Sequence, residues 1–182
     1  MKLRKILGIC GSLRRQSTNM GLLRYAKAKA PTGMEIEIAD LTAVPFYNAD
    51  LFEKPAAVKA LLDKMDAADA FLLACPEYNY SMAPALKNAL DWASREPDNR
   101  LLSGKPAAMM GAGGGMGTSR AQYHLRQVGV FLNLHFLNKP EVFCNAFTGG
   151  FDAEGNLVDE RIQGLIIQQL LALQVWVDKI RG

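Results

Sequence analysis

The stretch Ala70–Trp92, AFLLACPEYNYSMAPALKNALDW, contains a strand, a polar loop and a helix in succession. The apolar run Ala70–Cys75 is typical of a buried strand. Within Pro84–Ser94, apolar side chains recur at the spacing of one helix face, namely Leu86, Ala89, Leu90 and Ala93. The loop between strand and helix, Pro76–Ser81, holds two tyrosines, a glutamate, an asparagine and a serine. Rings and amides at the end of a buried strand favour a flat heteroaromatic ligand.

The same alternation of apolar runs and helical patterns continues along the chain. Strands are predicted at Lys5–Cys10, Met34–Asp40, Ala70–Cys75, Pro106–Met110 and Phe131–Leu137, the last with a possible extension to Cys144. Helices are predicted at Asn19–Lys29, Ala56–Ala67, Pro84–Ser94, Thr118–Val128 and Asp159–Ile180. Five such units with short connections predict a doubly wound parallel sheet with helices on both faces. Residues 1–182 are expected to form a single domain, with Leu41–Pro55 and Asn145–Val158 as its longer surface loops.

The composition is that of a globular cytoplasmic protein, with 49% hydrophobic and 21% charged residues in 182. A net charge of +3 gives no reason to expect nucleic acid or a membrane as a partner. The three cysteines are widely spaced, which favours reduced thiols in or near the core. Without a C-x-x-C pair or a His/Cys cluster, no metal site is expected. The first apolar stretch has only five residues, Ile6–Cys10, and is too short for a signal peptide.

Three unusual loops follow the first, third and fourth predicted strands: Gly11–Asn19, Pro76–Ser81 and Gly111–Gly117. In a five-stranded sheet of order 2-1-3-4-5 these strands are neighbours. Ligands of such sheets bind at the carboxyl ends of the strands, where the order reverses between strands one and three. The sequence therefore predicts that the three loops meet around one crevice.

The first loop, GSLRRQSTN, has the parts of a phosphate cradle. Gly11 is interpreted as allowing a tight turn, and the N–H groups of the following helix start are free for an anion. Hydroxyl and amide groups come from Ser12, Ser17, Thr18 and Asn19, and a cation from Arg14 or Arg15. The loop lacks the Gly-Lys-Ser/Thr of a Walker A motif, so a phosphomonoester is expected. The alternative is a solvated turn with a helix cap.

The second and third loops are interpreted as the two sides of a ring site. Tyr78 and Tyr80 are expected to lie along a heterocycle, with Asn79 at its polar edge. The alternative is that the tyrosines cover the sheet while Ser81 caps the next helix. The glycine-rich third loop, Gly111–Gly117, allows close approach of the backbone to a ligand, or is a flexible turn.

No acid–base or nucleophilic machinery is predicted. The sequence contains no G-x-S-x-G elbow, and neither His124 nor His135 has an evident nucleophile beside it, so both histidines are interpreted as structural. The glycine pattern of the third loop follows the fourth strand and has no ribose-binding acid after it, which disfavours a Rossmann dehydrogenase.

Taken together, the loops resemble the NAD(P)H-dependent FMN reductases of the flavodoxin-like superfamily, in particular its quinone and chromate reductases. The resemblance rests on GSLRRQSTN and PEYNYSMAPALKNALDW, with weaker support from LSGKP at Leu102–Pro106. It implies a flavodoxin-like fold and bound FMN, with the phosphate on the first loop and the ring against the second and third. The cofactor-binding residues implied are Ser12, Leu13, Arg14, Ser17, Thr18, Asn19, Pro76, Glu77, Tyr78, Asn79, Tyr80, Gly113 and Gly114.

The resemblance also implies a reaction and an assembly. NADH or NADPH passes hydride to flavin N5, and the electrons go on to quinones or to other small acceptors such as chromate and azo compounds. No catalytic side chain is required. A homodimer or homotetramer is expected, in which Arg120, Tyr123 and Glu141 form a hydrogen-bonded set between subunits; the alternative is an ordinary surface cluster.

Two other functions stay open at the level of sequence. One is an FMN-binding electron carrier that does not oxidise nicotinamide, which the basic charge balance disfavours. The other is a non-enzymatic nucleotide-binding module. The sequence does not decide between NADH and NADPH, because many surface arginines or lysines are able to contact a 2′-phosphate.

Overall fold

The computed structural model describes residues 3–182, so Met1 and Lys2 of the expected 1–182 domain lie outside the described residues. Its strands are β1 (Arg4–Cys10), β2 (Met34–Ile38), β3 (Ala70–Ala74), β4 (Glu77–Tyr78), β5 (Ser81–Met82), β6 (Pro106–Gly113), β7 (His135–Phe136) and β8 (Val142–Asn145). Its helices are α1 (Thr18–Ala28), α2 (Ala56–Ala67), α3 (Pro84–Ala93), the short 3-10 helix η1 (Pro97–Asn99), α4 (Ser119–Leu132) and α5 (Glu160–Arg181).

The main sheet is parallel and runs in the order β2-β1-β3-β6-β7, with β8 also paired to β6. Counted by position, this is the predicted order 2-1-3-4-5, which is confirmed. Successive side chains of each strand enter opposite cores, as the two-residue period of a strand requires. In β1, Leu7 and Ile9 join one core, whereas Ile6 and Cys10 join the other.

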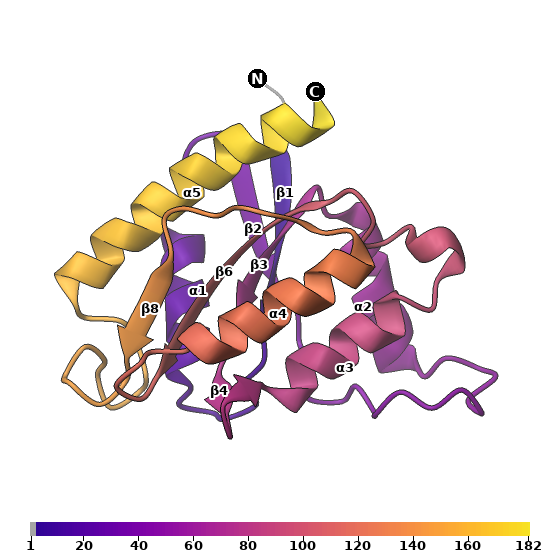
Figure 1. Cartoon of the computed structure of the whole chain (residues 1–182), viewed down its shortest axis with the longest axis horizontal. Helices are drawn as coiled ribbons and strands as arrows, with labels where there is room; N and C mark the ends of the chain where they lie inside the picture. The colour runs from indigo at the N-terminus through magenta and orange to yellow at the C-terminus, as the bar shows by residue number, and fades with distance from the viewer. Residues whose placement is uncertain (1–2) are drawn as a thin grey trace.

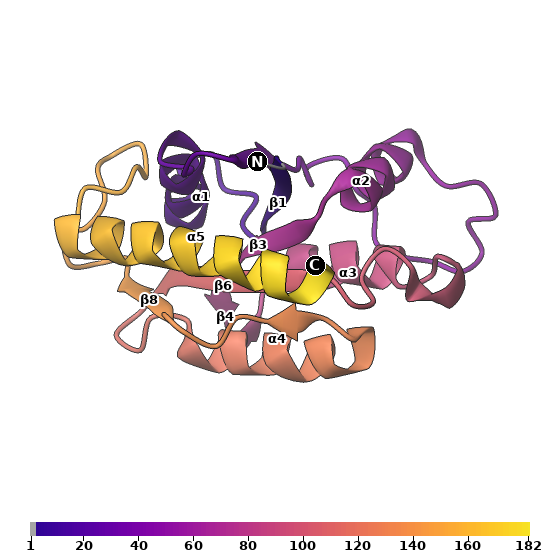
Figure 2. The ribbon, with the colours of Figure 1, turned by 90° about the horizontal axis from the view of Figure 1, so that it is seen from above.

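Each core is closed by its own set of helices, as Figures 1 and 2 show. Helices α2, α3 and α4 cover the face that buries Phe71 and Leu73. Helices α1 and α5 cover the face that buries Leu72. Both faces of the sheet are therefore dry, which explains why its strands are continuous apolar runs in the sequence.

The prediction of a fifth strand at Phe131–Leu137 is wrong in its bounds. Phe131 and Leu132 are the last residues of α4. The helix is capped by the next residue, Asn133, which is in the left-handed conformation. The fifth position in the sheet is shared by β7 and β8, each pairing with part of β6. Between them lies Pro140, which has no N–H to donate to the ladder. The predicted strand began too early because Phe131, in the last turn of α4, belongs to a residue type that is common in strands.

The segment Pro76–Ser81 was predicted as a loop, but it contains the antiparallel pair β4–β5. Asn79 and Tyr80 form the turn, with φ of 50° and 67°. Positive φ at both turn residues is the geometry of a type I′ hairpin. Asparagine tolerates this geometry, whereas a tyrosine there carries backbone strain.

The carboxyl ends of β1, β3 and β6 point to the same edge of the sheet, the lower edge in Figure 1, where the β4–β5 hairpin lies. The first of the longer loops, Leu41–Pro55, also starts at this edge, after β2. Within residues 3–182, no helix has the length and apolar character needed to span a membrane.

Candidate functional site

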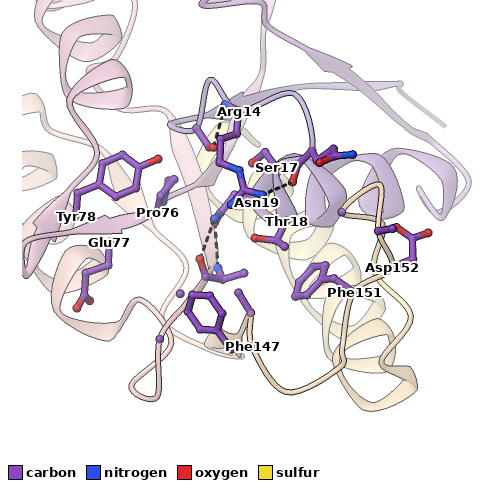
Figure 3. A pocket seen from close by; sticks show the side chains of 18 residues that line it. Arg14, Ser17, Thr18, Asn19, Pro76, Glu77, Tyr78, Phe147, Phe151 and Asp152 are labelled. Atoms are coloured by element: carbon purple, nitrogen blue, oxygen red, sulfur yellow. Dashed lines mark hydrogen bonds between the residues drawn. The ribbon is translucent and has the colours of Figure 1, made fainter.

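A cavity of about 430 Å³ opens at the carboxyl edge of the sheet (Figure 3). Ser17, Tyr78 and Gly113, one from each of the three loops, line it together. The predicted convergence of these loops is therefore confirmed. The full lining is Ser12, Arg14, Gln16, Ser17, Thr18, Asn19, Pro76, Glu77, Tyr78, Ala112, Gly113, Gly114, Ala146, Phe147, Phe151, Asp152, Ala153 and Gly155.

The first loop ends in an anion-binding helix start. Ser17 is the N-cap of α1, and its hydroxyl accepts the N–H of Met20 at 3.2 Å. The N–H groups of Thr18 and Asn19 stand in the first turn, where no helical acceptor exists. That turn carries no acidic side chain of its own that would compensate the positive end of the helix dipole. Arg14 adds a cation at the wall of the cavity, and Arg15 does not line it.

Gly11 serves a different purpose from the tight turn that the sequence suggested. Its φ is not positive, whereas a Cβ at this position would stand 2.9 Å from Pro76 Cδ and 3.0 Å from Ala83 Cβ. Only glycine therefore allows the first loop to lie directly against the second.

The first loop is tied to the third by Asn19. Its amide donates to the carbonyl of Ala112 at 2.8 Å and accepts the Ala112 N–H at 3.0 Å. The side chain is only 4% exposed. The sequence predicted that this amide binds a phosphate. In the structure, its oxygen and its nitrogen both bond to Ala112 and hold the start of α1 against the end of β6.

The second loop sends Pro76, Glu77 and Tyr78 into the cavity wall, while Asn79 and Tyr80 lie outside the lining. The Glu77 carboxylate, 6% exposed, accepts Arg120 Nε at 2.6 Å and the Ala121 N–H at 3.2 Å. The guanidinium also lies over the Tyr80 ring, 3.6 Å from its centroid. The hydrogen bond to Glu77 raises the pKa of Arg120. This pair fastens the strained hairpin to α4.

These contacts bear on the set expected between subunits. Arg120 has partners within its own chain, Glu77 and Tyr80, and Glu141 pairs with Lys139 at 2.6 Å. Tyr123 is exposed on α4. Arg120 and Glu141 thus have partners within their own chain, and the set between subunits stays a prediction.

The third loop contributes Ala112, Gly113 and Gly114. A Cβ at Gly113 would stand 2.4 Å from the carbonyl oxygen of Gly117, so the loop closes tightly on itself at this point. Gly114 is open to solvent. The cavity thus meets bare backbone on this side, and any contact there comes from main-chain groups.

A fourth wall comes from the connection 146–155, which sequence reasoning treated only as a surface loop. Phe147, 83% exposed, and Phe151 both line the cavity. Asp152 does so too, but its carboxylate accepts the N–H groups of Glu154 and Asn156, and these bonds lower its pKa. The sequence feature that could have predicted this wall is the pair of aromatic residues, Phe147 and Phe151, in a long polar connection after the last strand.

This wall is held against α1 by contact between two backbones. A Cβ on Gly21 would stand 1.9 Å from the carbonyl oxygen of Gly155. Arg24, one turn further along α1, donates to Asn156 Oδ1 at 2.9 Å. The loop therefore keeps its place only while residue 21 has no side chain.

Other candidate residues lie away from the cavity. Leu13 lines neighbouring hollows instead. His124 was expected to lack a nucleophile beside it, which is wrong: Ser81 Oγ is 2.9 Å from its Nδ1, although neither residue lines the cavity. The alternative that Ser81 caps the next helix is also wrong, because the N-cap of α3 is Ala83.

The three cysteines are free and buried, as predicted. Burial raises the pKa of all three thiols, that of Cys75 to about 12 and that of Cys144 to about 11. They are protonated at neutral pH and carry no thiolate chemistry. Among residues 3–182, no group of three His, Cys, Asp or Glu side chains is placed to hold a metal ion.

The donor set of the cavity fits a phosphate-bearing ring such as FMN. The start of α1 and Arg14 supply charge and N–H groups at one end. Tyr78, Phe147 and bare backbone surround the rest. A doubly wound sheet with these features defines a nucleotide-cofactor protein of the flavodoxin-like class.

Comparison with known proteins places the chain within that class. A sequence model of the family described as NADPH-dependent FMN reductase matches residues 4–149. The chain is 54% identical to an NAD(P)H-dependent FMN reductase of Pseudomonas aeruginosa, over 98% of this chain and 97% of the relative. It is 50% identical to an NAD(P)H:quinone oxidoreductase of Solanum tuberosum, over 98% of this chain and 95% of the relative. The chain belongs to the NADPH-dependent FMN reductase family.

Solved structures agree with this assignment. The flavoenzyme FerB of Paracoccus denitrificans, described as an NAD(P)H:(acceptor) oxidoreductase, superposes with a TM-score of 0.87 at 30% identity, covering 97% of this chain and 98% of FerB. A flavodoxin of Pseudomonas aeruginosa shares the fold, with a TM-score of 0.62 at 15% identity over 93% of this chain and 99% of the flavodoxin.

Replacing Asn19 tests the link between the first and third loops. Asn19→Ala leaves the buried N–H and C=O of Ala112 without partners, and we expect the free energy of unfolding to fall by about 2–4 kcal/mol. The matched control is Asn138→Ala, whose exposed amide meets only Arg126 and should cost less than about 0.5 kcal/mol. Urea unfolding followed by circular dichroism measures both. Equal losses in the two variants would contradict the role given to Asn19.

Replacing Gly21 tests the attachment of the fourth wall. Gly21→Ala should lower the free energy of unfolding by about 1–3 kcal/mol, because the new methyl group overlaps Gly155. Gly164→Ala, in α5 with open space around it, should instead raise it by about 0.5–1 kcal/mol. Thermal unfolding distinguishes the two signs, and a stabilised Gly21→Ala protein would refute the close contact.

Proposed function

We propose that this protein is an FMN-dependent NAD(P)H oxidoreductase that reduces quinones. The observation that carries the proposal is the single cavity shared by Ser17, Tyr78 and Gly113. Support also comes from relatives named as FMN reductases or quinone oxidoreductases, which match nearly the full length of this chain.

At one end of the cavity, the start of α1 and Arg14 are proposed to hold the phosphate of FMN. The N–H groups of Thr18 and Asn19 and the dipole of α1 favour a dianion. Arg14 donates to the carbonyl of Gln16 at 3.3 Å, which leaves other guanidinium N–H groups for a phosphate oxygen. The Ser12 side chain adds a hydroxyl at the same wall.

The ring of FMN is proposed to lie between the second and third loops. Tyr78 and Pro76 bound one side, Gly113 and Gly114 the other, and Phe147 stands at the exposed edge. FMN in this position supplies the redox chemistry, taking hydride from NADH or NADPH and giving two electrons to a quinone. Leu13, Asn79 and Tyr80, which lie outside the lining, are proposed to support these walls rather than to touch the cofactor.

The surrounding side chains position groups and do not transfer protons. The Glu77 carboxylate is held by Arg120 and the Ala121 N–H, so it is not a free base. The buried thiols keep their protons. Of the two hydrogens that a quinone gains on becoming a quinol, one comes with the electron pair as the hydride of NADH or NADPH, and the other is proposed to be a proton from water at the open mouth of the cavity.

Further properties follow from the same proposal. Chromate and azo compounds are proposed as additional acceptors, because backbone and aromatic walls impose little selectivity on a small oxidant. We propose a single cytoplasmic domain, which the buried free cysteines support. A homodimer or homotetramer is proposed, and light scattering measures which of the two forms.

A spectrum of the purified protein tests the function directly. The protein loaded with FMN should absorb in the visible, bleach when NADPH or NADH is added without oxygen, and regain its colour when a benzoquinone follows. Persistent colour after NADPH and NADH would instead indicate an electron carrier. Failure to take up FMN at all would indicate a different nucleotide-binding module.

The phosphate end is tested by comparing FMN with riboflavin. Arg14→Gln should weaken FMN binding about 5–30-fold, because one charge-assisted contact of about 1–2 kcal/mol is lost. It should leave riboflavin binding within about twofold, since riboflavin has no phosphate. Quenching of flavin fluorescence measures both, and Arg15→Gln is the matched control. Equal weakening for both flavins would contradict the assignment.

A further inference from the structure

A second cavity, of about 300 Å³, lies on the other side of the first loop from the site described above. It opens between the carboxyl ends of β1 and β2 and is lined by Cys10, Ser12, Leu13, Arg14, Arg15, Met20, Ile38, Ala39, Asp40, Leu41 and Thr42. Ser12 and Arg14 line both cavities. A molecule seated in the second cavity therefore reaches the rim of the first.

A third, smaller cavity of about 160 Å³ continues the second. The two share Leu13, Leu41 and Thr42, and the third adds a largely apolar lining of Val44, Phe46, Pro84, Ala85 and Asn88. The three hollows thus adjoin one another, with charge beside the first loop and apolar surface in the third. Phe46 is 75% exposed there.

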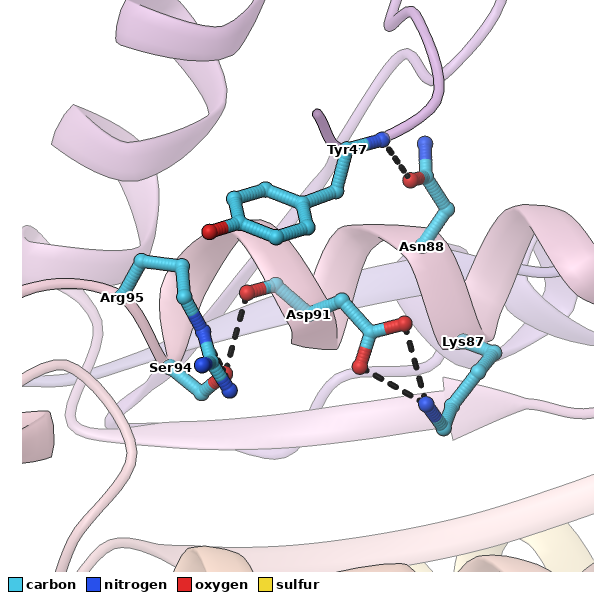
Figure 4. A network of polar contacts seen from close by, with 6 residues as sticks. All are labelled: Tyr47, Lys87, Asn88, Asp91, Ser94 and Arg95. Carbon is cyan, nitrogen blue, oxygen red and sulfur yellow. Dashed lines mark hydrogen bonds and ion pairs between the residues drawn. The ribbon is translucent and has the colours of Figure 1, made fainter. Parts of the chain in front are cut away.

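The segment that carries Phe46 is anchored through its neighbours Pro45 and Tyr47, and Figure 4 shows the bond between Tyr47 and Asn88. The carbonyl of Pro45 accepts Asn88 Nδ2 at 2.9 Å and Trp92 Nε1 at 2.8 Å. The N–H of Tyr47 donates to Asn88 Oδ1 at 2.8 Å, and its ring meets Trp92 edge to face at 5.1 Å. An exposed aromatic side chain on a fixed backbone loses little entropy when a ring packs on it.

The second cavity contains a cation and a carboxylate that are both able to bind a ligand. Arg15 is exposed and makes no hydrogen bond or ion pair with any residue from 3 to 182. Asp40 follows β2, and one of its oxygens accepts both the N–H and the hydroxyl of Thr42 at 2.9 and 2.7 Å. The backbone hydrogen bond from Thr42 is the main cause that lowers the pKa of Asp40, so the carboxylate is ionised. Its second oxygen remains available as an acceptor.

An acid just beyond β2, beside a β1 loop, is where dinucleotide-binding sheets receive the ribose of the adenosine half. Arg15 supplies the cation that a pyrophosphate requires. Phe46 and Leu13 offer an apolar platform for a purine. The cation and the ribose acceptor line the second cavity and the platform lines the third, so the charged and the apolar groups are separated as they are in the adenosine half of a nicotinamide dinucleotide.

We propose that the second and third cavities bind the adenosine diphosphate half of NADH or NADPH. Arg15 holds the pyrophosphate, Asp40 accepts from a ribose hydroxyl and Phe46 packs on the adenine. This subsite rests on the proposed function, because it orients the donor whose nicotinamide enters the first cavity. It makes the connection Leu41–Pro55 a substrate-binding loop.

The test compares donors that keep or lack the adenosine half. In the FMN-loaded protein, Arg15→Gln and Phe46→Ala should each raise KM for NADH and NADPH about 5–30-fold, as one lost contact of about 1–2 kcal/mol predicts. The value of kcat should stay within about twofold. Dihydronicotinamide riboside lacks both phosphates and the adenosine, so its KM should not change. Lys27→Gln, an exposed cation at the opposite end of α1, is the control for net charge.

Binding without turnover gives a second readout. ADP-ribose, which carries no nicotinamide, should bind the FMN-loaded protein in isothermal titration calorimetry, and Arg15→Gln and Phe46→Ala should weaken that binding about 5–30-fold. The subsite is overturned if the variants leave NADH, NADPH and ADP-ribose unaffected, or if KM for the riboside rises equally. Failure of every donor, including the riboside, to reduce the loaded protein would instead overturn the proposed function.

Discussion

The arrangement of the site depends on one paired hydrogen bond, between the Asn19 amide and the backbone of Ala112. It joins the first turn of α1 to the carboxyl end of β6. In the sheet, β3 lies between β6 and β1, the strand that precedes α1. Because the N–H and the C=O of Ala112 are buried, losing the two hydrogen bonds to Asn19 leaves both groups without a partner in the core. The distance between the anion-binding helix start and the glycine loop is therefore set by a contact within the core and not by the loops themselves.

The remaining walls are attached to this frame by contacts of different strength. The hairpin with Tyr78 carries strain at Tyr80 and is fastened to α4 by the buried Glu77 carboxylate and Arg120. The wall with Phe147 and Phe151 has no such buried ion pair; it rests on the backbone contact of Gly21 with Gly155 and on the Arg24–Asn156 bond. This fourth wall is the one better suited to adjust to different acceptors, because its side-chain anchor, the Arg24–Asn156 bond, is at the surface.

The sequence predicted what is local and left unpredicted what depends on packing. The strands follow from apolar runs, and the meeting of three loops follows from their glycine and polar residues once the sheet has the order of a flavodoxin-like fold; the order and the meeting of the loops are both confirmed. The hairpin turn was missed because Tyr80 is a poor residue for positive φ, and its contact with Arg120 is not visible in the local sequence. The amide of Asn19 was given to a ligand because nothing in its local sequence shows that Ala112 lies opposite. The wall at Phe147 was missed for the same reason, since its place depends on Gly21.

The two arginines of GSLRRQSTN show how such packing decides function. The sequence left open whether Arg14 or Arg15 faces the phosphate, and only Arg14 lines the first cavity. Both line the second cavity, so one short loop separates two hollows and offers cations to each. A cofactor phosphate and a donor pyrophosphate are both polyanions and repel one another at close range. Arg14 lines both hollows and Arg15 lines the second, so in the proposed site each of the two anions faces an arginine and the two need not share a single cation. The adjacency of the two arginines in sequence therefore suits the proposed site, in which two anionic nucleotides lie side by side.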